Sequence, residues 1–160
     1  APASIYHYFG DRGGLIDAAL MHRFTRSYLD LNEDIDAALD RVQSIEEVPN
    51  IIRSISRIVA DDSRMKLRLE RAFIIGSTLY RESMRRTVAE ATQAAIEDLA
   101  RVIAKHQARG ILPAHIDPLP AASWISSLNF GRLIQDMIGL DVPDDVFSDM
   151  TQRAYEALFL

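Results

Sequence analysis

Apolar residues recur at intervals of three and four along most of the chain, the spacing that places them on one face of a helix. Leu15, Ala18, Met21 and Leu29 form such a series and predict a helix from residue 11 to about residue 31. The acidic stretch 32–40 is interpreted as the end of that helix and a connection, with a short helix through Ile35, Leu39 and Val42 as the alternative. Further helices are predicted over residues 45–60, 64–80, 82–109, 118–140 and 144–159. Because no strand pattern and no internal repeat occurs, the predicted fold class is all-α, with about seven helices.

Residues that favour helix ends mark several of these boundaries. Ser44 and Glu47 have the spacing of a capping box. Gly110 suits the left-handed conformation that commonly ends a helix. Asp117 before Pro118 has the pattern of an N-cap residue followed by a proline in the first turn.

The helix predicted over residues 64–80 carries two interleaved sets of residues. Its apolar set is Met65, Leu69, Ala72, Phe73, Gly76 and Leu79. Its charged set is Arg64, Lys66, Arg68, Glu70 and Arg71. The mixed signs of charge indicate a solvated face, and a basic surface for nucleic acid is the alternative interpretation.

The helix predicted over residues 118–140 is apolar on two sides, which indicates contact with two different partners. Together with the stripe on the last helix, it would expose an apolar patch that soluble monomers rarely tolerate. Pairing the same two helices from two chains would bury both in a four-helix, two-fold interface. The residues predicted for this interface are Phe130, Ile134, Met137, Met150 and Leu158.

Composition narrows the possible function classes. The chain has 160 residues, enough for one domain with a sizeable core, and 48% of them are hydrophobic. It contains no cysteine, so neither a disulfide framework nor a thiolate metal site is available. The formal net charge of −5 argues against a protein that coats nucleic acid with its whole surface. No apolar run approaches the roughly 20 residues that cross a bilayer, so we expect no membrane contact. The lack of cysteine fits a reducing environment, and we expect a cytoplasmic location.

Patterns typical of catalytic and metal sites are missing from the sequence. None of His7, His22, His106 and His115 has a glutamate three residues before it, and no His-Glu-x-x-His sequence occurs. The chain also lacks a Gly-x-Ser-x-Gly turn and a glycine-rich phosphate loop. We therefore expect no enzyme activity, no metal and no cofactor.

The first fifteen residues hold the most specific pattern in the chain. Ile5 and Phe9 lie four apart and so share a helical face. Between them stand three rings that can form hydrogen bonds, Tyr6, His7 and Tyr8. Gly10 suits the end of this short helix, and the carboxylate of Asp11 can cap the next one. The stretch therefore predicts a short helix, a tight turn and the start of a long helix.

This pattern resembles the end of the helix-turn-helix in the TetR (tetracycline-repressor-like) family of bacterial regulators. In that family the recognition helix ends in an aliphatic residue, Tyr, a variable residue, His or Tyr, and Phe, and a basic residue and a Leu follow the turn. The matching residues here are Ile5, Tyr6, His7, Tyr8, Phe9, Arg12 and Leu15. The resemblance implies a DNA-binding set made up of Ala1, Pro2, Tyr6, His7, Tyr8 and Arg12.

Gly13 and Gly14 depart from the family, which has good helix formers at these positions. Each glycine costs a helix roughly 1 kcal/mol against alanine, so we expect a loosely held helix start. The family also places two helices and an arm before this stretch, so the sequence is expected to be part of a longer protein.

The resemblance implies a ligand-responsive transcriptional regulator, a repressor that a small molecule releases from operator DNA and that acts as a homodimer. Residues 1–30 would be the end of the helix-turn-helix, and residues 31–160 a TetR-like ligand-binding and dimerisation domain. The alternative is a small-molecule-binding or protein-interaction helical domain with no role on DNA. Reading the residues encoded before Ala1 would discriminate between the two.

An effector cavity between helices would be lined mostly by apolar side chains with a few polar groups. The aromatic candidates, expected to meet in one interior, are Phe73, Tyr80, Trp124 and Phe130. They would suit an apolar or aromatic effector. For each of them, packing in a solid core is the alternative interpretation.

Overall fold

A computed structural model describes residues 7–160, and over this range the fold is all-α, as predicted. Its α-helices are α2 (Arg12–Asp40), α3 (Val48–Ala60), α4 (Met65–Ser77), α5 (Glu82–Ala108), α6 (Pro118–Ile138) and α7 (Asp144–Phe159). The short 3-10 turns Ile45–Glu47 and Asp62–Arg64 precede α3 and α4, and residues 7–9 are also helical. The predictions for Ala1, Pro2 and Tyr6 lie outside the described residues. No helix within residues 7–160 is long and apolar enough to cross a bilayer.

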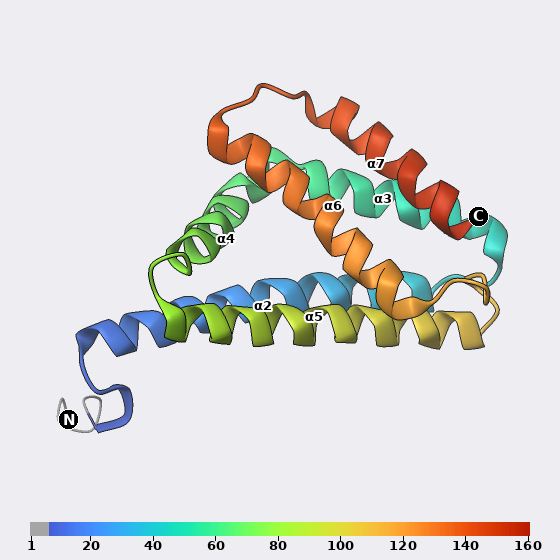
Figure 1. The fold of residues 1–160 in the computed structure, drawn as a ribbon. Helices are drawn as coiled ribbons and strands as arrows, with labels where there is room; N and C mark the ends of the chain where they lie inside the picture. Colours follow the sequence, from blue (N-terminus) through green and yellow to red (C-terminus); the bar gives the residue numbers. More distant parts are fainter. Residues whose placement is uncertain (1–6) are drawn as a thin grey trace.

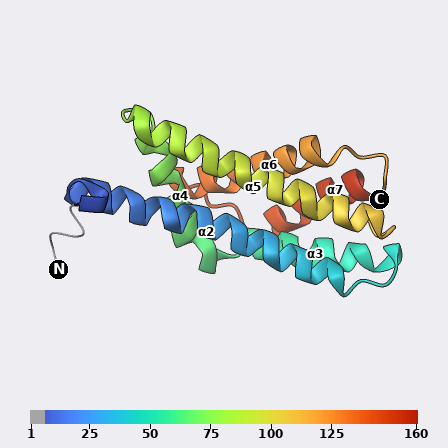
Figure 2. The same cartoon turned by 90° about the horizontal axis from the view of Figure 1, so that it is seen from below.

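Helices α2 and α5 lie side by side, run in the same direction and form one long layer (Figure 1, Figure 2). α6 packs on α5, α7 packs along α3, and α4 packs on α6 near the N-terminal end of the layer. The main hydrophobic core lies between these helices and includes Leu39, Ile52, Leu99, Ile125 and Tyr155. A smaller core joins the first half of α2 to α4 and α5 through Phe24, Ile74, Met84 and Val88.

Helix α2 continues to Asp40 instead of ending near Leu31, so the predicted connection over residues 32–40 is wrong. Asn32 is buried, and its amide donates to the backbone carbonyl of Ala95 on α5 at 3.0 Å. Further along, Asp36 and Asp40 pair with basic side chains at the end of α5. The acidic residues of this stretch therefore belong to the face of α2 that contacts α5.

Of the predicted helix-end signals at Ser44, Gly110 and Asp117, two are confirmed and one is wrong. Gly110 has a φ of +72°, in the left-handed region, directly after α5. Asp117 caps α6, its carboxylate accepting from the backbone N–H of Leu119 at 3.3 Å. The capping box at Ser44 is wrong, because this residue precedes a 3-10 turn and makes no capping hydrogen bond.

Helix α4 turns to the interior a different face from the one that its apolar pattern predicts, although Ala72 of that pattern is buried there together with Ile74. Phe73 is 68% exposed, whereas Arg68 is only 5% exposed. Arg68 forms an ion pair with Asp136 of α6, and Arg71 donates to the Ser27 hydroxyl of α2 at 2.9 Å. The solvated-face prediction is therefore wrong for both arginines, because polar contacts with α2 and α6 set the orientation of this helix.

Candidate DNA-contacting tip and interior cavities

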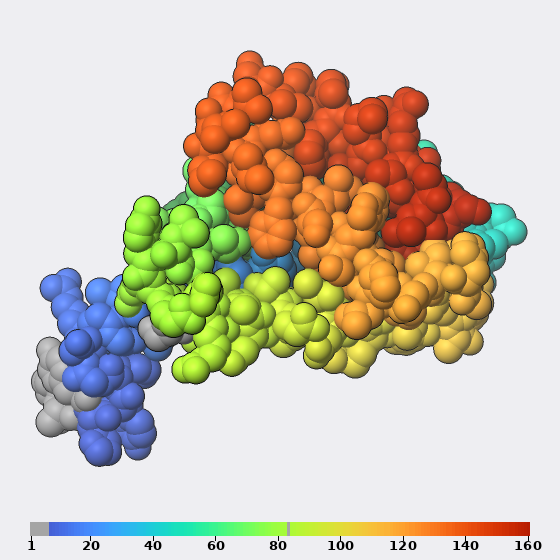
Figure 3. Space-filling view, in the orientation of Figure 1, coloured from blue at the N-terminus to red at the C-terminus, as the bar shows by residue number. Residues whose placement is uncertain are grey.

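The described part of the segment predicted to contact DNA is an exposed tip, residues 7–12, which leads into the N-terminal end of α2. His7, Tyr8 and Arg12 are all exposed, and Tyr8 is 79% exposed. The rings of His7 and Tyr8 meet edge to face, with their centroids 5.6 Å apart. This end of α2 projects beyond the body formed by the other helices (Figure 1, Figure 3). The three side chains are therefore accessible to a partner molecule.

A tight turn fixes the angle between the tip and α2. Gly10 has a φ of +76°, and the Asp11 carboxylate caps α2 by accepting from the N–H of Gly14 at 2.8 Å. Gly14 lies so close to the preceding turn that a Cβ added there would come within 2.0 Å of the carbonyl oxygen of Phe9. The turn therefore requires a glycine at position 14, which accounts for the departure from helix formers there.

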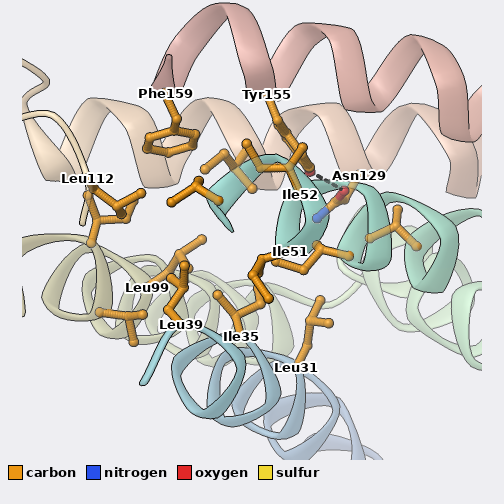
Figure 4. A pocket seen from close by; sticks show the side chains of 16 residues that line it. Leu31, Ile35, Leu39, Ile51, Ile52, Leu99, Leu112, Asn129, Tyr155 and Phe159 are labelled. Carbon is orange, nitrogen blue, oxygen red and sulfur yellow. Dashed lines mark hydrogen bonds between the residues drawn. The ribbon is translucent and has the colours of Figure 1, made fainter. Parts of the chain in front are cut away.

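An apolar cavity of about 60 Å³ lies in the main core (Figure 4). Its walls come mostly from α2, α3, α5, α6 and α7, with labelled lining residues Leu31, Ile35, Leu39, Ile51, Ile52, Leu99, Leu112, Asn129, Tyr155 and Phe159. The Tyr155 hydroxyl donates to the side-chain oxygen of Asn129 at 3.2 Å. Burial raises the pKa of the Tyr155 hydroxyl above its usual value, so this polar pair stays neutral.

A second cavity of about 40 Å³ adjoins the first, because Leu31, Val59 and Asn129 line both. Its lining includes three arginines from α4 and the turn before it, Arg64, Arg68 and Arg71. Sequence reasoning missed these residues as components of a site. Their spacing of four and then three residues, which places them on one helical face, is the signal that could have identified them.

The four aromatic residues predicted to line one cavity do not meet. Phe73 lies in a separate open groove of about 420 Å³ beside α2, and Tyr80 is 90% exposed. Trp124 is half-exposed, with its ring centroid 6.3 Å from that of Tyr155, which lines the apolar cavity. Phe130 lines the second cavity. The expected shared interior is wrong for Phe73, which lies on the outward side of α4, and for Tyr80, which follows the end of α4 and is exposed.

The residues predicted for a dimer interface divide into exposed and packed positions. Ile134, Met137 and Met150 are 50%, 55% and 62% exposed. Phe130 is partly buried, and Leu158 packs against the main core, so Leu158 faces inward in the single chain. Helices α6 and α7 lie on the same face of the molecule (Figure 3). We give the name α6–α7 face to the following exposed apolar residues of these two helices: Trp124, Ile134, Met137, Ile138, Val146 and Met150.

One cluster of side chains has the composition of a metal site, at the end of α2 away from the tip. Asp36, Asp40 and His106 bring their ligand atoms within 4.8 Å of one another. Lys105 already pairs with both carboxylates, at 2.8 Å from Asp36 and 2.9 Å from Asp40. Burial alone would raise the pKa of Asp36, but hydrogen bonds from Lys105 and His106 hold it below its usual value. The cluster is therefore accounted for as an internal ion-pair network that joins α2 to α5.

Comparison with known proteins identifies the fold. No family model matches the sequence, and no curated protein matches it significantly. Among solved structures, the chain is similar to the crystal structure of a Rhodococcus sp. protein described as a TetR-family transcriptional regulator. The match has a TM-score of 0.70 at 21% sequence identity and covers 100% of this chain and 81% of that chain. The chain therefore has the fold of that TetR-family protein, as its resemblance to the helix-turn-helix pattern implied.

Proposed function

We propose that the intact protein is a DNA-binding transcriptional regulator, a repressor whose affinity for its operator is lowered by a small molecule. The observation that carries this proposal is the double role of α2. Its N-terminal end bears the exposed Arg12, while Leu31 and Ile35 further along the same helix line the apolar cavity. At 1.5 Å per residue, Arg12 and Leu31 are roughly 30 Å apart along one helix. A displacement of α2 at the cavity therefore moves the tip.

The side chains at the tip suit contact with DNA. Arg12 supplies a positive charge for phosphate, and the rings of His7 and Tyr8 supply hydrogen-bonding groups. In a helix-turn-helix, phosphate contacts position the protein and base-edge contacts specify the sequence. Residues 1–30 would then belong to the DNA reader, and residues 31–160 to the effector and dimerisation domain.

A second copy of the chain is the partner that we propose for the α6–α7 face. Soluble monomers rarely leave such an apolar surface exposed. Exposed small residues on α6, Ser127 and Gly131, allow a partner helix to approach closely, and a Cβ added to Gly131 meets no atom within 4 Å apart from its chain neighbours and the adjacent backbone of α6. A two-fold dimer would hold two tips at a separation that must match half-sites about one helical turn of DNA, or a multiple, apart.

Ligand binding would act on the tips by moving α2. The apolar cavity of about 60 Å³ is smaller than the roughly 300–1,000 Å³ of typical ligand pockets. An effector would therefore have to separate α2 from the helices across the cavity in order to enter. The operator and the effector would then favour different positions of α2, with a reciprocal coupling free energy that is typically about 1–3 kcal/mol.

The experiment that tests this function selects DNA from a random double-stranded library with the intact protein encoded by the gene. A symmetric dimer should enrich a sequence with two-fold symmetry, because each subunit reads one half-site. Absence of selective DNA binding by a folded, intact protein would contradict the proposal. That result would favour the helical domain that binds a small molecule or a protein and has no role on DNA.

A further inference from the structure

Arg68 is buried in the second cavity with one guanidinium nitrogen unpaired. Its Nε pairs with Asp136, and its Nη1 donates to the backbone carbonyls of Val59 and Asp61 at 3.0 and 2.9 Å. Its Nη2 is buried and has no hydrogen-bond partner among residues 7–160. A buried donor on a charged group is costly to leave unpaired, so this nitrogen favours a ligand with an acceptor.

Arg71 is a second guanidinium in the lining of this cavity. Its Nε and Nη2 donate to the hydroxyl and the carbonyl of Ser27 at 2.9 and 2.6 Å, and its guanidinium lies 4.2 Å from the ring centroid of Tyr28. Within the described range it has no ion pair with an Asp or Glu. Burial lowers the pKa of the Arg71 guanidinium; Tyr28 opposes this shift, and Arg64 and Arg68 add to it. Its neighbours therefore solvate this cation without neutralising it.

The charge of the second cavity is not balanced by its own lining, which includes Arg64, Arg68 and Arg71 but neither Asp nor Glu. The Asp136 carboxylate, which is not part of the lining, forms ion pairs with both Arg68 and Arg132. Its Oδ1 lies 3.5 Å from Nε of Arg132. Asp61, which is exposed, acts on Arg64 and Arg68 from the surface side. A poorly solvated cavity with excess positive charge favours an anion.

The adjoining cavity has the opposite character. Its lining is apolar except for Asn129 and Tyr155, and Asn129 lines both cavities. A molecule that spans both would need an anionic group at one end and an apolar body at the other. A carboxylate is the anion that matches guanidinium geometry while remaining small enough for a volume of about 40 Å³.

We propose that the effector is an amphipathic carboxylate, with its carboxylate between Arg68 and Arg71 and its short chain or ring in the apolar cavity. The inference rests on the proposed function only in treating this molecule as the effector. Tyr28, Arg64, Ser126 and Asn129, which also line the second cavity, are further polar side chains available to the carboxylate. The ligand contacts α2 through Tyr28 and Leu31, on the helix that carries the tip.

Isothermal titration calorimetry on the full chain tests this assignment without DNA. The probes are linear carboxylates from butanoate to decanoate and benzoate, each beside the primary alcohol of the same skeleton. At least one acid should bind about tenfold or more tightly than its alcohol, because charge-assisted hydrogen bonds are the stronger ones. Arg71→Gln should abolish that preference, because it should weaken the binding of the acid and leave the binding of the alcohol unchanged. Arg86→Gln, which changes an exposed arginine of α5, should retain it.

Equal affinities for acids and alcohols, or no binding of any acid, would overturn the proposal. An unchanged preference for the acid in Arg71→Gln would overturn it as well. If Arg71→Gln fails to fold, the comparison of acids with alcohols on the unaltered chain still tests the proposal. If no acid is preferred over its alcohol, the proposal that the intact protein selects a DNA sequence still stands. If the intact protein selects no DNA sequence, a measured preference for the acid still stands.

Discussion

His106 Nε2 lies 2.7 Å from Asp36 Oδ1, across the contact between α5 and α2. The other ring nitrogen, Nδ1, accepts a hydrogen bond from Arg109 at 2.8 Å, and arginine can only donate. His106 therefore carries its proton on Nε2 and donates it to Asp36. Because His106 is fully buried, this hydrogen bond fixes the register of α2 against α5 at the end of α2 away from the tip.

Removal of the Asp36 carboxylate should destabilise the fold. In Asp36→Ala the buried Nε2–H of His106 loses its acceptor, at a cost of about 1–3 kcal/mol in the free energy of unfolding. Asp36→Asn keeps an acceptor oxygen and should lose less. The control is Asp34→Ala, at an exposed position of the same helix, which should change stability by no more than about 0.5 kcal/mol. Urea unfolding measures all three variants, and equal losses in Asp34→Ala and Asp36→Ala would contradict this role.

Acid should weaken the same contact. Burial raises the pKa of the Asp36 carboxyl, but the hydrogen bonds and charges of Lys105 and His106 lower it by more. The pKa of Asp36 therefore lies below its usual value of 3.8. A carboxyl with a lowered pKa in the folded state adds stability above its unfolded pKa and loses it as pH falls through the folded value. The free energy of unfolding should therefore drop below about pH 4, and less steeply in Asp36→Asn. Urea unfolding at a series of pH values tests this, and identical slopes for both proteins would exclude Asp36 as a contributor.

Alanine at position 14 should disturb the tip, and alanine at position 13 should not. A Cβ on Gly14 would lie 2.0 Å from the Phe9 carbonyl oxygen, whereas a Cβ on Gly13 meets only the Asp11 side chain, at 3.1 Å. Gly14→Ala must shift the backbone of the turn, at a cost of about 1–3 kcal/mol, and should weaken operator binding by the intact protein. Gly13→Ala should bind normally. Fluorescence anisotropy with operator DNA measures both, and equal affinities would argue against a fixed turn.

Most helix boundaries could be predicted from the sequence because they depend on local signals. Gly110 places the end of α5, and Asp117 places the start of α6, each through its own backbone preference. The pattern around residues 5–15 carried the resemblance to the TetR family, and the match to the Rhodococcus sp. protein confirms the fold that it implied.

The orientation of α4 could not be predicted in this way, because it depends on residues far along the chain. Its apolar stripe and its arginine stripe are both regular, and local spacing does not decide which of them faces inward. Arg68 pairs with Asp136, 68 residues away, and Arg71 donates to Ser27, 44 residues away. These partners turn the arginines inward and Phe73 outward, so α4 contributes Arg68 and Arg71, and not Phe73, to the lining of the second cavity.

Arg12 should contribute affinity for DNA without contributing sequence preference. It is exposed beside the turn of the tip, where a guanidinium suits a phosphate contact. In the intact protein, Arg12→Ala should weaken binding to all sequences and reduce the slope of log K against log salt by about one. The control is Arg23→Ala on the same helix, whose guanidinium pairs with Glu70 at 2.6 Å. An altered sequence preference with an unchanged salt slope would argue against the phosphate contact.

Gly131 offers a way to block the proposed dimer without unfolding the chain. It is exposed on α6, one turn before Ile134, and a Cβ added there meets no atom within 4 Å apart from its chain neighbours and the adjacent backbone of α6. Gly131→Leu should therefore fit the single chain, and replacing a helical glycine should favour α6 by up to about 1 kcal/mol. In a two-fold dimer the two added side chains would occupy the space that the partner helix needs.

Sedimentation should show the unaltered chain as a dimer at micromolar concentration, with roughly 1,500 Å² or more of surface buried in total. Gly131→Leu should sediment as a monomer of unchanged helical content. Ile134→Arg should also lose the dimer, because the charge would meet its own copy in a buried symmetric contact. Ala94→Arg adds the same charge at an exposed position of α5 and should remain dimeric. A monodisperse monomer for the unaltered chain, or a stable dimer in both α6 variants, would exclude the α6–α7 face as the subunit interface.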